Sequence, residues 1–211
     1  MTRLLAAVCA LFLLPLIAVG AEPRSIDEGI EYRLIEPPLP VDVPAGKVLV
    51  TEQFWYGCPH CYHFEPKLQE WLKKQGDRVA FERRPSTLNP AWGVHAKAYY
   101  TAEILGVLDK IHEPLFDAIH KEHRQLNTED DLAKFFTEHG VDEAEFRKVF
   151  NSFFVRTKLA RDKALTENCC ASGVPNIIIN GKYFTDASYG GGLDGLLQVM
   201  DHLVDKELAG K

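Results

Sequence analysis

The chain has 211 residues, of which 46% are hydrophobic and 26% are charged. This size and composition predict one domain, or one domain with an insertion, around a sizeable core, and they exclude an intrinsically disordered chain. The formal net charge of −6 argues against non-specific binding to nucleic acid, so we expect no nucleic-acid partner.

The first residues have the pattern of a secretory signal peptide. Arg3 precedes an apolar run, Leu4–Val19, and small residues follow it. We therefore expect residues 1–21 to be cleaved and the protein to be exported. A membrane anchor is the alternative, but the run is short for a span and Pro15 interrupts it. Cleavage would remove Cys9 and leave four cysteines in an oxidising compartment.

Two strands with a helix between them are predicted in the first half of the chain. The alternating segment Ile30–Glu36 is typical of an edge strand, and Lys47–Trp55 of a buried strand. Apolar residues at helical spacing over 62–76 predict a helix that ends at Gly76, and Arg78–Pro85 predicts the next strand. This order indicates a βαβ unit with parallel strands.

Helices dominate the next part of the chain. Residues 91–168 lack strand signals and show repeated capping patterns, which predict four or five helices. Gly173–Phe184 predicts a hairpin with Asn180-Gly181 as its turn, and residues 191–208 an amphipathic helix. The sequence thus predicts an α/β fold with an inserted all-α helical subdomain.

The tetrapeptide Cys58-Pro59-His60-Cys61 is compatible with several kinds of site. A c-type haem needs histidine directly after the second cysteine, where Tyr62 stands. Zinc needs four ligands, and the adjacent pair Cys169-Cys170 is poorly suited to complete such a set, so we expect no metal. A structural crosslink remains an alternative, although so small a ring adds little stability.

A redox centre has a physical reason. Cys58 would lie at a helix N-terminus, where unpaired N–H groups and the helix dipole stabilise a thiolate, and His60 would add to this effect. Cys61, one turn into the helix, would be shielded. The distant pair Val174-Pro175 stands at a strand start, where a cis proline typically marks a functional turn.

The segments "EQFWYGCPHCYHFEP" and "GVPNIIINGKYF", with the helical insertion between them, resemble the DsbA family of periplasmic thiol:disulfide oxidoreductases. The resemblance covers essentially the whole mature chain. It implies a thioredoxin-like fold, with a thioredoxin-like domain over residues 22–90 and 169–211, an inserted helical subdomain over 91–168, and a location in the periplasm.

The resemblance also implies roles for the tetrapeptide. Cys58 matches the nucleophile that forms the mixed disulfide with substrate, and Cys61 its buried partner in the redox-active disulfide. Pro59 and His60 match the dipeptide that tunes the redox potential.

Three further residues have implied roles. Glu52 matches a buried acid that assists proton transfer, although a solvated strand position is the alternative. Val174 and Pro175 match the cis-proline loop, which binds the substrate backbone like an added strand.

Two departures from the family are visible. Some members have a lysine facing the buried acid, and the sequence does not decide which of Glu82, Arg83 and Arg84 would face Glu52 here. Asn176 is polar where many members have a small or apolar residue, and its effect on substrate contacts stays open.

The pair Cys169-Cys170 has no role in the family pattern. Three alternatives remain open: two free thiols, a strained vicinal disulfide, or exchange with the active site, since the pair precedes Pro175 by only a few residues.

The implied function is disulfide donation to exported proteins with reduced cysteines. The implied partner for reoxidation is a DsbB-like membrane quinone reductase, which would dock on an apolar groove near the cysteines. No metal or organic cofactor is implied. The segment Glu22–Gly46 is too short for the dimerisation domain of many isomerases, so we expect a monomer. A disulfide isomerase or reductase, and a chaperone or binding module with a structural CxxC, are the alternatives.

Overall fold

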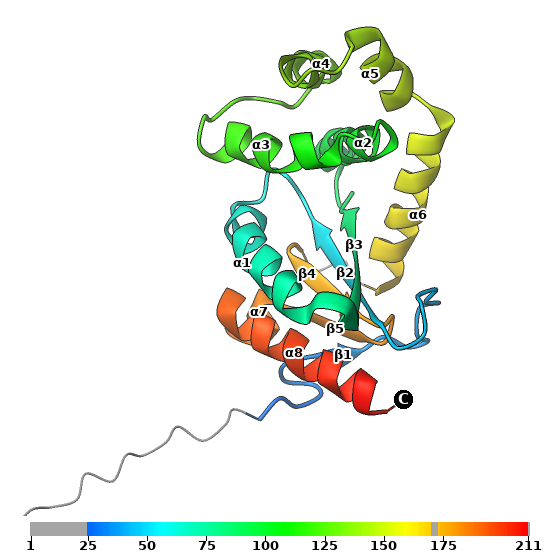
Figure 1. Ribbon diagram of the computed structural model, residues 1–211, viewed down its shortest axis with the longest axis vertical. Coiled ribbons are helices and arrows are strands. Elements are labelled where there is room, and N and C mark those ends of the chain that lie inside the picture. Colours follow the sequence, from blue (N-terminus) through cyan, green and yellow to red (C-terminus); the bar gives the residue numbers. More distant parts are fainter. Residues whose placement is uncertain (1–24, 170–172, 211) are drawn as a thin grey trace, which may run out of the picture.

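The computed structural model describes residues 25–169 and 173–210 (Figure 1). The predicted signal peptide, with Cys9, and also Cys170 lie outside the described residues. Among the described helices, none is long and apolar enough to cross a membrane.

A five-stranded sheet forms the centre of the lower part in Figure 1. Its order is β1-β5-β4-β2-β3; β2 and β3 are parallel, and the other pairs are antiparallel. The parallel pair is joined by helix α1 (Pro59–Gln75), so the predicted βαβ unit is confirmed. The strands are β1 Arg33–Leu34, β2 Val48–Phe54, β3 Val79–Pro85, β4 Asn176–Ile179 and β5 Tyr183–Asp186.

The predicted edge strand is longer than the strand in the structure, whereas the predicted hairpin turn is present. The strand predicted over Ile30–Glu36 is wrong in extent, because only β1 pairs with β5. The predicted hairpin turn is confirmed: Asn180 and Gly181 have φ values of 49° and 66°, the left-handed region that such a turn requires. A side chain at Gly181 would also clash, since its Cβ would lie 2.5 Å from the Leu39 carbonyl oxygen.

Five helices follow β3 and form the upper part of Figure 1. The last of them, α6, runs back along the side of the molecule to the sheet (Figure 1). Thr128 and Asp142 cap α4 and α5, as their side chains accept hydrogen bonds from backbone N–H groups. These helices are α2 Pro90–Ile104, α3 Leu108–His120, α4 Glu129–Glu138, α5 Glu143–Phe150 and α6 Phe153–Cys169.

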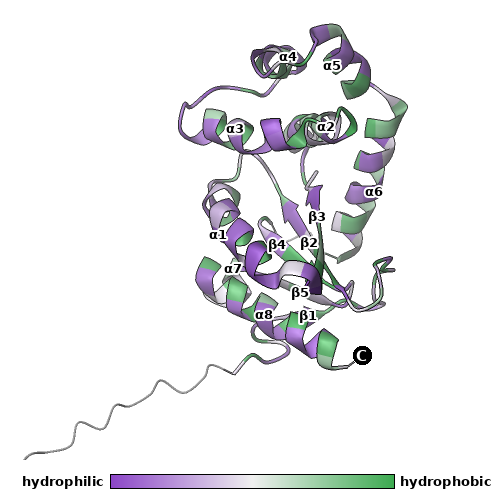
Figure 2. Ribbon diagram, in the orientation of Figure 1, coloured by the Kyte–Doolittle hydropathy of each residue, from purple (hydrophilic) through white to green (hydrophobic). Residues whose placement is uncertain are grey.

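Two helices follow the hairpin: the short α7 (Ala187–Gly190), which the sequence did not predict, and α8 (Leu193–Ala209). Hydrophobic and hydrophilic residues alternate along α8 (Figure 2), as the amphipathic pattern predicts. Its apolar side packs with α1 against the sheet, in a core that includes Val50, Leu68 and Leu203.

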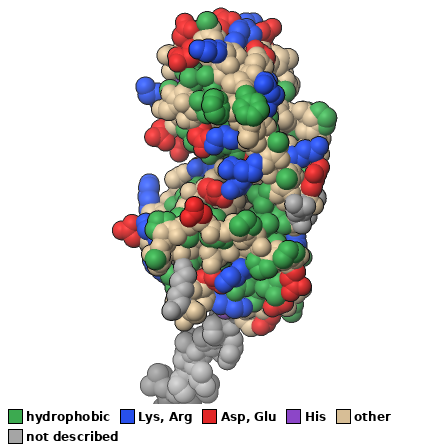
Figure 3. All heavy atoms as spheres, turned by 90° about the vertical axis from the view of Figure 1, so that its right-hand side faces the viewer, with side chains coloured by type: hydrophobic (Ala, Val, Ile, Leu, Met, Phe, Trp, Pro, Cys, Tyr) green, Lys and Arg blue, Asp and Glu red, His purple; other side chains and the backbone are tan. Residues whose placement is uncertain are grey.

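A second core joins the end of β2 to the helical insertion. Phe54 and Tyr56 pack there with Phe116 of α3, and the same cluster contains Cys58 and Cys61. The two cysteines therefore lie where the sheet meets the inserted helices. On the face drawn in Figure 3, lysine and arginine are interspersed with aspartate and glutamate, so no single-sign patch covers that face.

Candidate active site

The turn from β2 into α1 places Cys58 at the helix N-cap. Its backbone N–H donates to the Trp55 carbonyl oxygen at 2.9 Å, and Pro59 follows at the first helical position. Gly57 is required in this turn, because a Cβ there would lie 2.2 Å from the Trp55 ring. The sulfur of Cys58 accepts a hydrogen bond from the backbone N–H of Cys61 at 3.4 Å. The sequence thus positions the sulfur over the helix N-terminus.

The two cysteines are free thiols with opposite environments. The hydrogen bond from the Cys61 side chain lowers the pKa of Cys58 from 9.0 to about 6, against the effect of burial; backbone N–H groups and the charge of His60 assist. Burial raises the pKa of Cys61 well above its ordinary value. The exposed fractions are 7% for Cys58 and 1% for Cys61. One thiol is thus acidic and reachable, and the other is a shielded, protonated thiol.

The cis-proline loop faces this pair. The Val174–Pro175 peptide bond is cis, and the Cys58 thiol donates to the Val174 carbonyl oxygen at 3.3 Å. His60 and this loop line a cavity of about 310 Å³ together with residues from the start of α7. The structure therefore brings together Cys58, Cys61, His60 and the Val174-Pro175 pair, which the sequence analysis selected from two distant segments.

Glu52 lies buried in β2, with 1% exposure, and pairs in register with Arg83 of β3. Its carboxylate accepts from Arg83 Nε at 3.0 Å, and Arg83 also donates to Glu65 of α1 at 2.7 Å. Burial raises the pKa of Glu52 to about 7, because it outweighs the attraction of Arg83. The strand position of Glu52 is thus buried rather than solvated.

Glu65 completes this cluster and was missed by the sequence analysis. Burial opposes its ionisation, but His112 and Arg83 together hold its pKa at about 2. His112 Nε2 lies 3.5 Å from the carboxylate, too long for a strong hydrogen bond, so the ion pair with Arg83 is the tighter contact. A signal existed: Cys61, Phe64, Glu65 and Leu68 form a buried stripe at helical spacing, in which an acid is unusual.

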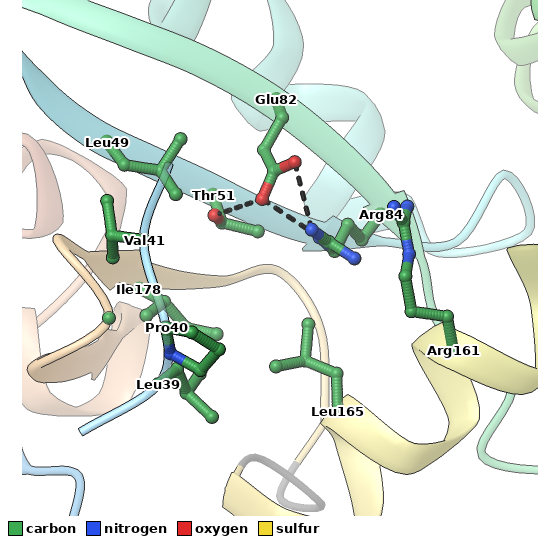
Figure 4. A pocket seen from close by; sticks show the side chains of 11 residues that line it. Leu39, Pro40, Val41, Leu49, Thr51, Glu82, Arg84, Arg161, Leu165 and Ile178 are labelled. Carbon is green, nitrogen blue, oxygen red and sulfur yellow. Dashed lines mark hydrogen bonds and ion pairs between the residues drawn. The ribbon is translucent and has the colours of Figure 1, made fainter. Parts of the chain in front are cut away.

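The register of β3 answers which of its charged residues faces Glu52. Side chains alternate along a strand, so Arg83 lies on the α1 face while Glu82 and Arg84 lie on the opposite face. On that face Thr51 and Arg84 donate to Glu82, at 2.8 and 2.9 Å, beside a cavity of about 200 Å³ (Figure 4). This second cavity lies across the sheet from Glu52 and contains no described residue of the cis-proline loop or of α1.

Asn176 follows the cis proline and is fully buried. Its side-chain amide donates to the Gly173 carbonyl oxygen at 2.7 Å. This polar side chain thus lies below the surface and bonds within the loop itself, while its effect on substrate contacts stays a prediction. Asn176 pairs in register with Gln53, whose amide donates to Thr166 of α6 at 3.0 Å.

Cys169 ends α6 and is disulfide-bonded. Neither Cys58 nor Cys61 is its partner, since both are free. Cys170 lies outside the described residues. The alternative of two free thiols is therefore wrong for Cys169. Arg33 donates to the backbone carbonyl of Cys169, which connects the end of α6 to β1.

An acidic thiol at a helix N-terminus, a shielded partner thiol and a facing cis-proline loop form a geometry suited to thiol–disulfide exchange. Among the described residues, no group of three or more histidine, cysteine, aspartate or glutamate side chains is placed to hold a metal ion. The site is thus that of a redox protein of the thioredoxin-like class.

Comparison with known proteins agrees with this class. A family model described as a DSBA-like thioredoxin domain matches residues 93–198. The thiol:disulfide interchange protein DsbA of Pseudomonas syringae is 41% identical over 204 residues, which cover 97% of this chain and 94% of that protein. DsbA of Azotobacter vinelandii is 39% identical and covers 94% of this chain and 92% of its own.

Solved structures show the same relation. The crystal structure of Pseudomonas aeruginosa DsbA matches with a TM-score of 0.81 at 40% identity, covering 87% of this chain and 95% of that chain. DsbA from Xylella fastidiosa matches with a TM-score of 0.78 at 34% identity, covering 84% and 95%. The chain belongs to the DsbA family. It has a thioredoxin-like α/β fold and is a thiol:disulfide oxidoreductase.

Proposed function

We propose that this protein donates the Cys58–Cys61 disulfide to exported proteins with reduced cysteines in the periplasm. The observation that supports it best is the contrast between the two thiols: the pKa of Cys58 is lowered to about 6, and that of Cys61 is raised. A stable Cys58 thiolate favours the reduced enzyme, and so makes the oxidised enzyme a strong disulfide donor. Each unit of pKa depression is worth about 1.4 kcal/mol.

The proposed reaction is a two-step exchange. A substrate thiolate attacks the Cys58 sulfur, the Cys58–Cys61 bond breaks, and Cys61 leaves as a thiolate that takes up a proton. A second substrate thiolate then attacks the substrate sulfur of the mixed disulfide and releases the Cys58 thiolate. The substrate loses two electrons and gains one disulfide, and the enzyme gains two electrons as a dithiol.

Each site residue has a proposed part in this reaction. Cys61 needs a proton on leaving, because its pKa is high, and Glu52, with a pKa of about 7, is suited to supply it and to take it back. Pro59 and His60 set the potential of the ring. Val174 and Pro175 hold the substrate backbone beside Cys58.

The cycle closes when the reduced enzyme passes two electrons to a DsbB-like membrane quinone reductase. We also propose that the enzyme works as a monomer, with a thioredoxin-like domain over residues 22–90 and 169–211 and a helical subdomain over 91–168. Most of one core comes from α2–α6, with the end of β2 and the start of α1 at its border, and a separate core lies under α1 and α8; this supports the division.

Two measurements test the function. Thiolate absorbance of the reduced protein should titrate near pH 6 and lose this transition in Cys58→Ser. Equilibration with glutathione should show that the protein is more oxidising than the glutathione couple. An ordinary thiol pKa, near about 8.5, together with a reducing potential would contradict disulfide donation and favour a reductase.

A further inference from the structure

The cavity beside Cys58 has two walls that come from different parts of the fold. One wall is His60 with the loop Gly173–Pro175; the other is the corner between β5 and α7, with Asp186, Ala187 and Ser188. The walls face each other because Asn176 and Asp186 are paired in the β4–β5 register. A substrate chain bound along the loop would therefore run past this corner.

Asp186 gives the cavity a fixed negative charge. One of its carboxylate oxygens accepts from the backbone N–H groups of Ser188 and Tyr189, at 2.7 and 3.1 Å, so the side chain is held in place. The other groups that line the cavity are His60 and uncharged residues. Within the described part of the chain, no lysine or arginine forms an ion pair with Asp186.

The remaining described lining of the cavity mixes apolar side chains with Gly173 and Ser188. Val174, Pro175 and Ala187 supply the apolar part of the lining, in the same cavity as His60 and the carboxylate of Asp186. A lysine or arginine side chain fits such a surface, because its aliphatic stem packs on apolar groups while its charged end reaches an acid. An acidic side chain would meet like charge, and a purely aliphatic one would give the carboxylate no cation to pair with.

We propose that this cavity is a substrate subsite that prefers a lysine or arginine next to the reactive cysteine of the substrate. Residues along an extended chain rise about 3.3 Å each, so a neighbour of a cysteine bonded to Cys58 lies within reach of the cavity. The subsite rests on the proposed function, since it selects among the thiol substrates of that reaction.

The test uses the oxidised full-length mature protein and three peptides that differ at one position. The residue after the single cysteine is lysine, glutamine or glutamate, and the rate of mixed-disulfide formation is measured in a single turnover at low salt. We expect the lysine peptide to react about fivefold faster than the glutamine peptide, and the glutamate peptide to react slowest, as for a partly exposed ion pair. Added salt should compress these differences.

Two variants identify the residue responsible. Asp186→Asn keeps a good N-cap for α7 but removes the charge, so the ratio of the lysine rate to the glutamate rate should fall toward one. Ser188→Lys places a cation at an exposed position of the same wall, beside the retained Asp186 carboxylate, and should also bring the ratio toward one. Asp194→Asn, the same substitution at the start of α8, is the control and should retain the ratio of the unmodified protein.

The outcomes separate the two proposals. If the three peptides react at the same rate, or if Asp186→Asn slows them equally without changing the ratio, the subsite is wrong while disulfide donation stands. If no peptide forms a mixed disulfide with Cys58, the proposed function itself fails. A lysine preference that is lost in Asp186→Asn, reduced in Ser188→Lys and retained in Asp194→Asn supports the subsite.

Discussion

The two faces of the central sheet each carry a buried ion cluster, and only one of them lies beneath the cysteines. On the α1 face, Arg83 lies between Glu52 and Glu65; we call this the thiol-side cluster. On the opposite face, Arg84 lies between Glu82 and Asp162; we call this the α6-side cluster. In each cluster an arginine from β3 lies between two carboxylates, and the two arginines are adjacent in the strand. In the α6-side cluster, Arg161 also lies 3.6 Å from Asp162.

The difference between the clusters lies in burial and in neighbours. The side chains of the thiol-side cluster are 1–12% exposed, whereas Glu82 of the α6-side cluster is 32% exposed. Glu52 acts electrostatically on both cysteines. Asp162 of α6 accepts from Tyr100 of α2 and from Arg84 of β3, and so joins the helical insertion to the sheet. The same residue types thus tune a thiol on one face and fasten two parts of the fold on the other.

The largest expected effect separates the clusters by stability. Arg83→Met would leave Glu52 and Glu65 buried without their cation, so the free energy of unfolding should fall by about 3 kcal/mol. Arg84→Met should cost less, because water reaches Glu82 and Arg161 still pairs with the buried Asp162. Urea denaturation of both variants measures the difference. Equal losses would mean that burial does not distinguish the two faces.

The pH dependence of stability should report the thiols. The folded-state pKa of Cys58 is lowered to about 6, so its ionisation stabilises the folded reduced protein above the unfolded value near 9, and this contribution is lost as pH falls through about 6. In the oxidised protein Cys58 has no ionisable thiol, so this contribution to stability is absent. The stability of the reduced form, relative to that of the oxidised form, should therefore fall by on the order of 2 kcal/mol from pH 9 to pH 5. This value is smaller than the full effect of the pKa shift, because the sulfur is partly in contact with water.

A variant on the other face serves as the reference for this titration. In Glu82→Gln, the difference in stability between the reduced and oxidised forms should change over the same pH range as in the unmodified protein. The reason is that neither cysteine contacts the α6-side cluster. A shifted window in that variant would show that the clusters are coupled across the sheet. Denaturation curves at matched pH values give both results.

Glu52→Gln should slow the release of Cys61 during mixed-disulfide formation by about tenfold, because the proton donor is lost. The pH–rate profile should also lose an inflection near 7, the pKa of Glu52. Stopped-flow measurements with a reduced peptide, with Glu82→Gln as the matched variant, test this. Indistinguishable profiles for the two variants would remove the proton-transfer role of Glu52.

The smallest expected effect concerns Asn176, which lies on the α6 face of the sheet yet holds the cis-proline loop. Asn176→Ala removes a neutral hydrogen bond worth about 1 kcal/mol, and the rate of mixed-disulfide formation should fall a few-fold. Gln53→Ala, its register partner, loses a comparable bond to Thr166 and should keep the rate. If Asn176→Ala and Gln53→Ala form the mixed disulfide at the same rate, the Asn176 hydrogen bond does not connect the α6 face to the function of the cis-proline loop.

Local patterns account for what could be predicted. The helix caps at Thr128 and Asp142, the Asn180-Gly181 turn and the start of α1 depend on hydrogen bonds and backbone preferences within a few residues. The edge strand was overpredicted because alternation alone does not show where a partner strand ends.

Long-range packing accounts for what was missed. Arg83 could not be chosen over its neighbours without the β2–β3 register, and Asp186 belongs to the site only because the β4–β5 register places it beside the cis-proline loop. The buried contact of Asn176 depends on the same loop.

The sequence by itself determined a CxxC at a helix start and a Val-Pro pair at a strand start, since both depend on neighbouring residues. Only the tertiary structure decided that the sulfur of Cys58 lies 3.3 Å from the carbonyl oxygen of Val174, which is 116 positions away in the chain. It also decided that Glu52 has a pKa of about 7 while Glu65 has one of about 2. Burial and the positions of charges set these values, and both arise only when distant segments pack together.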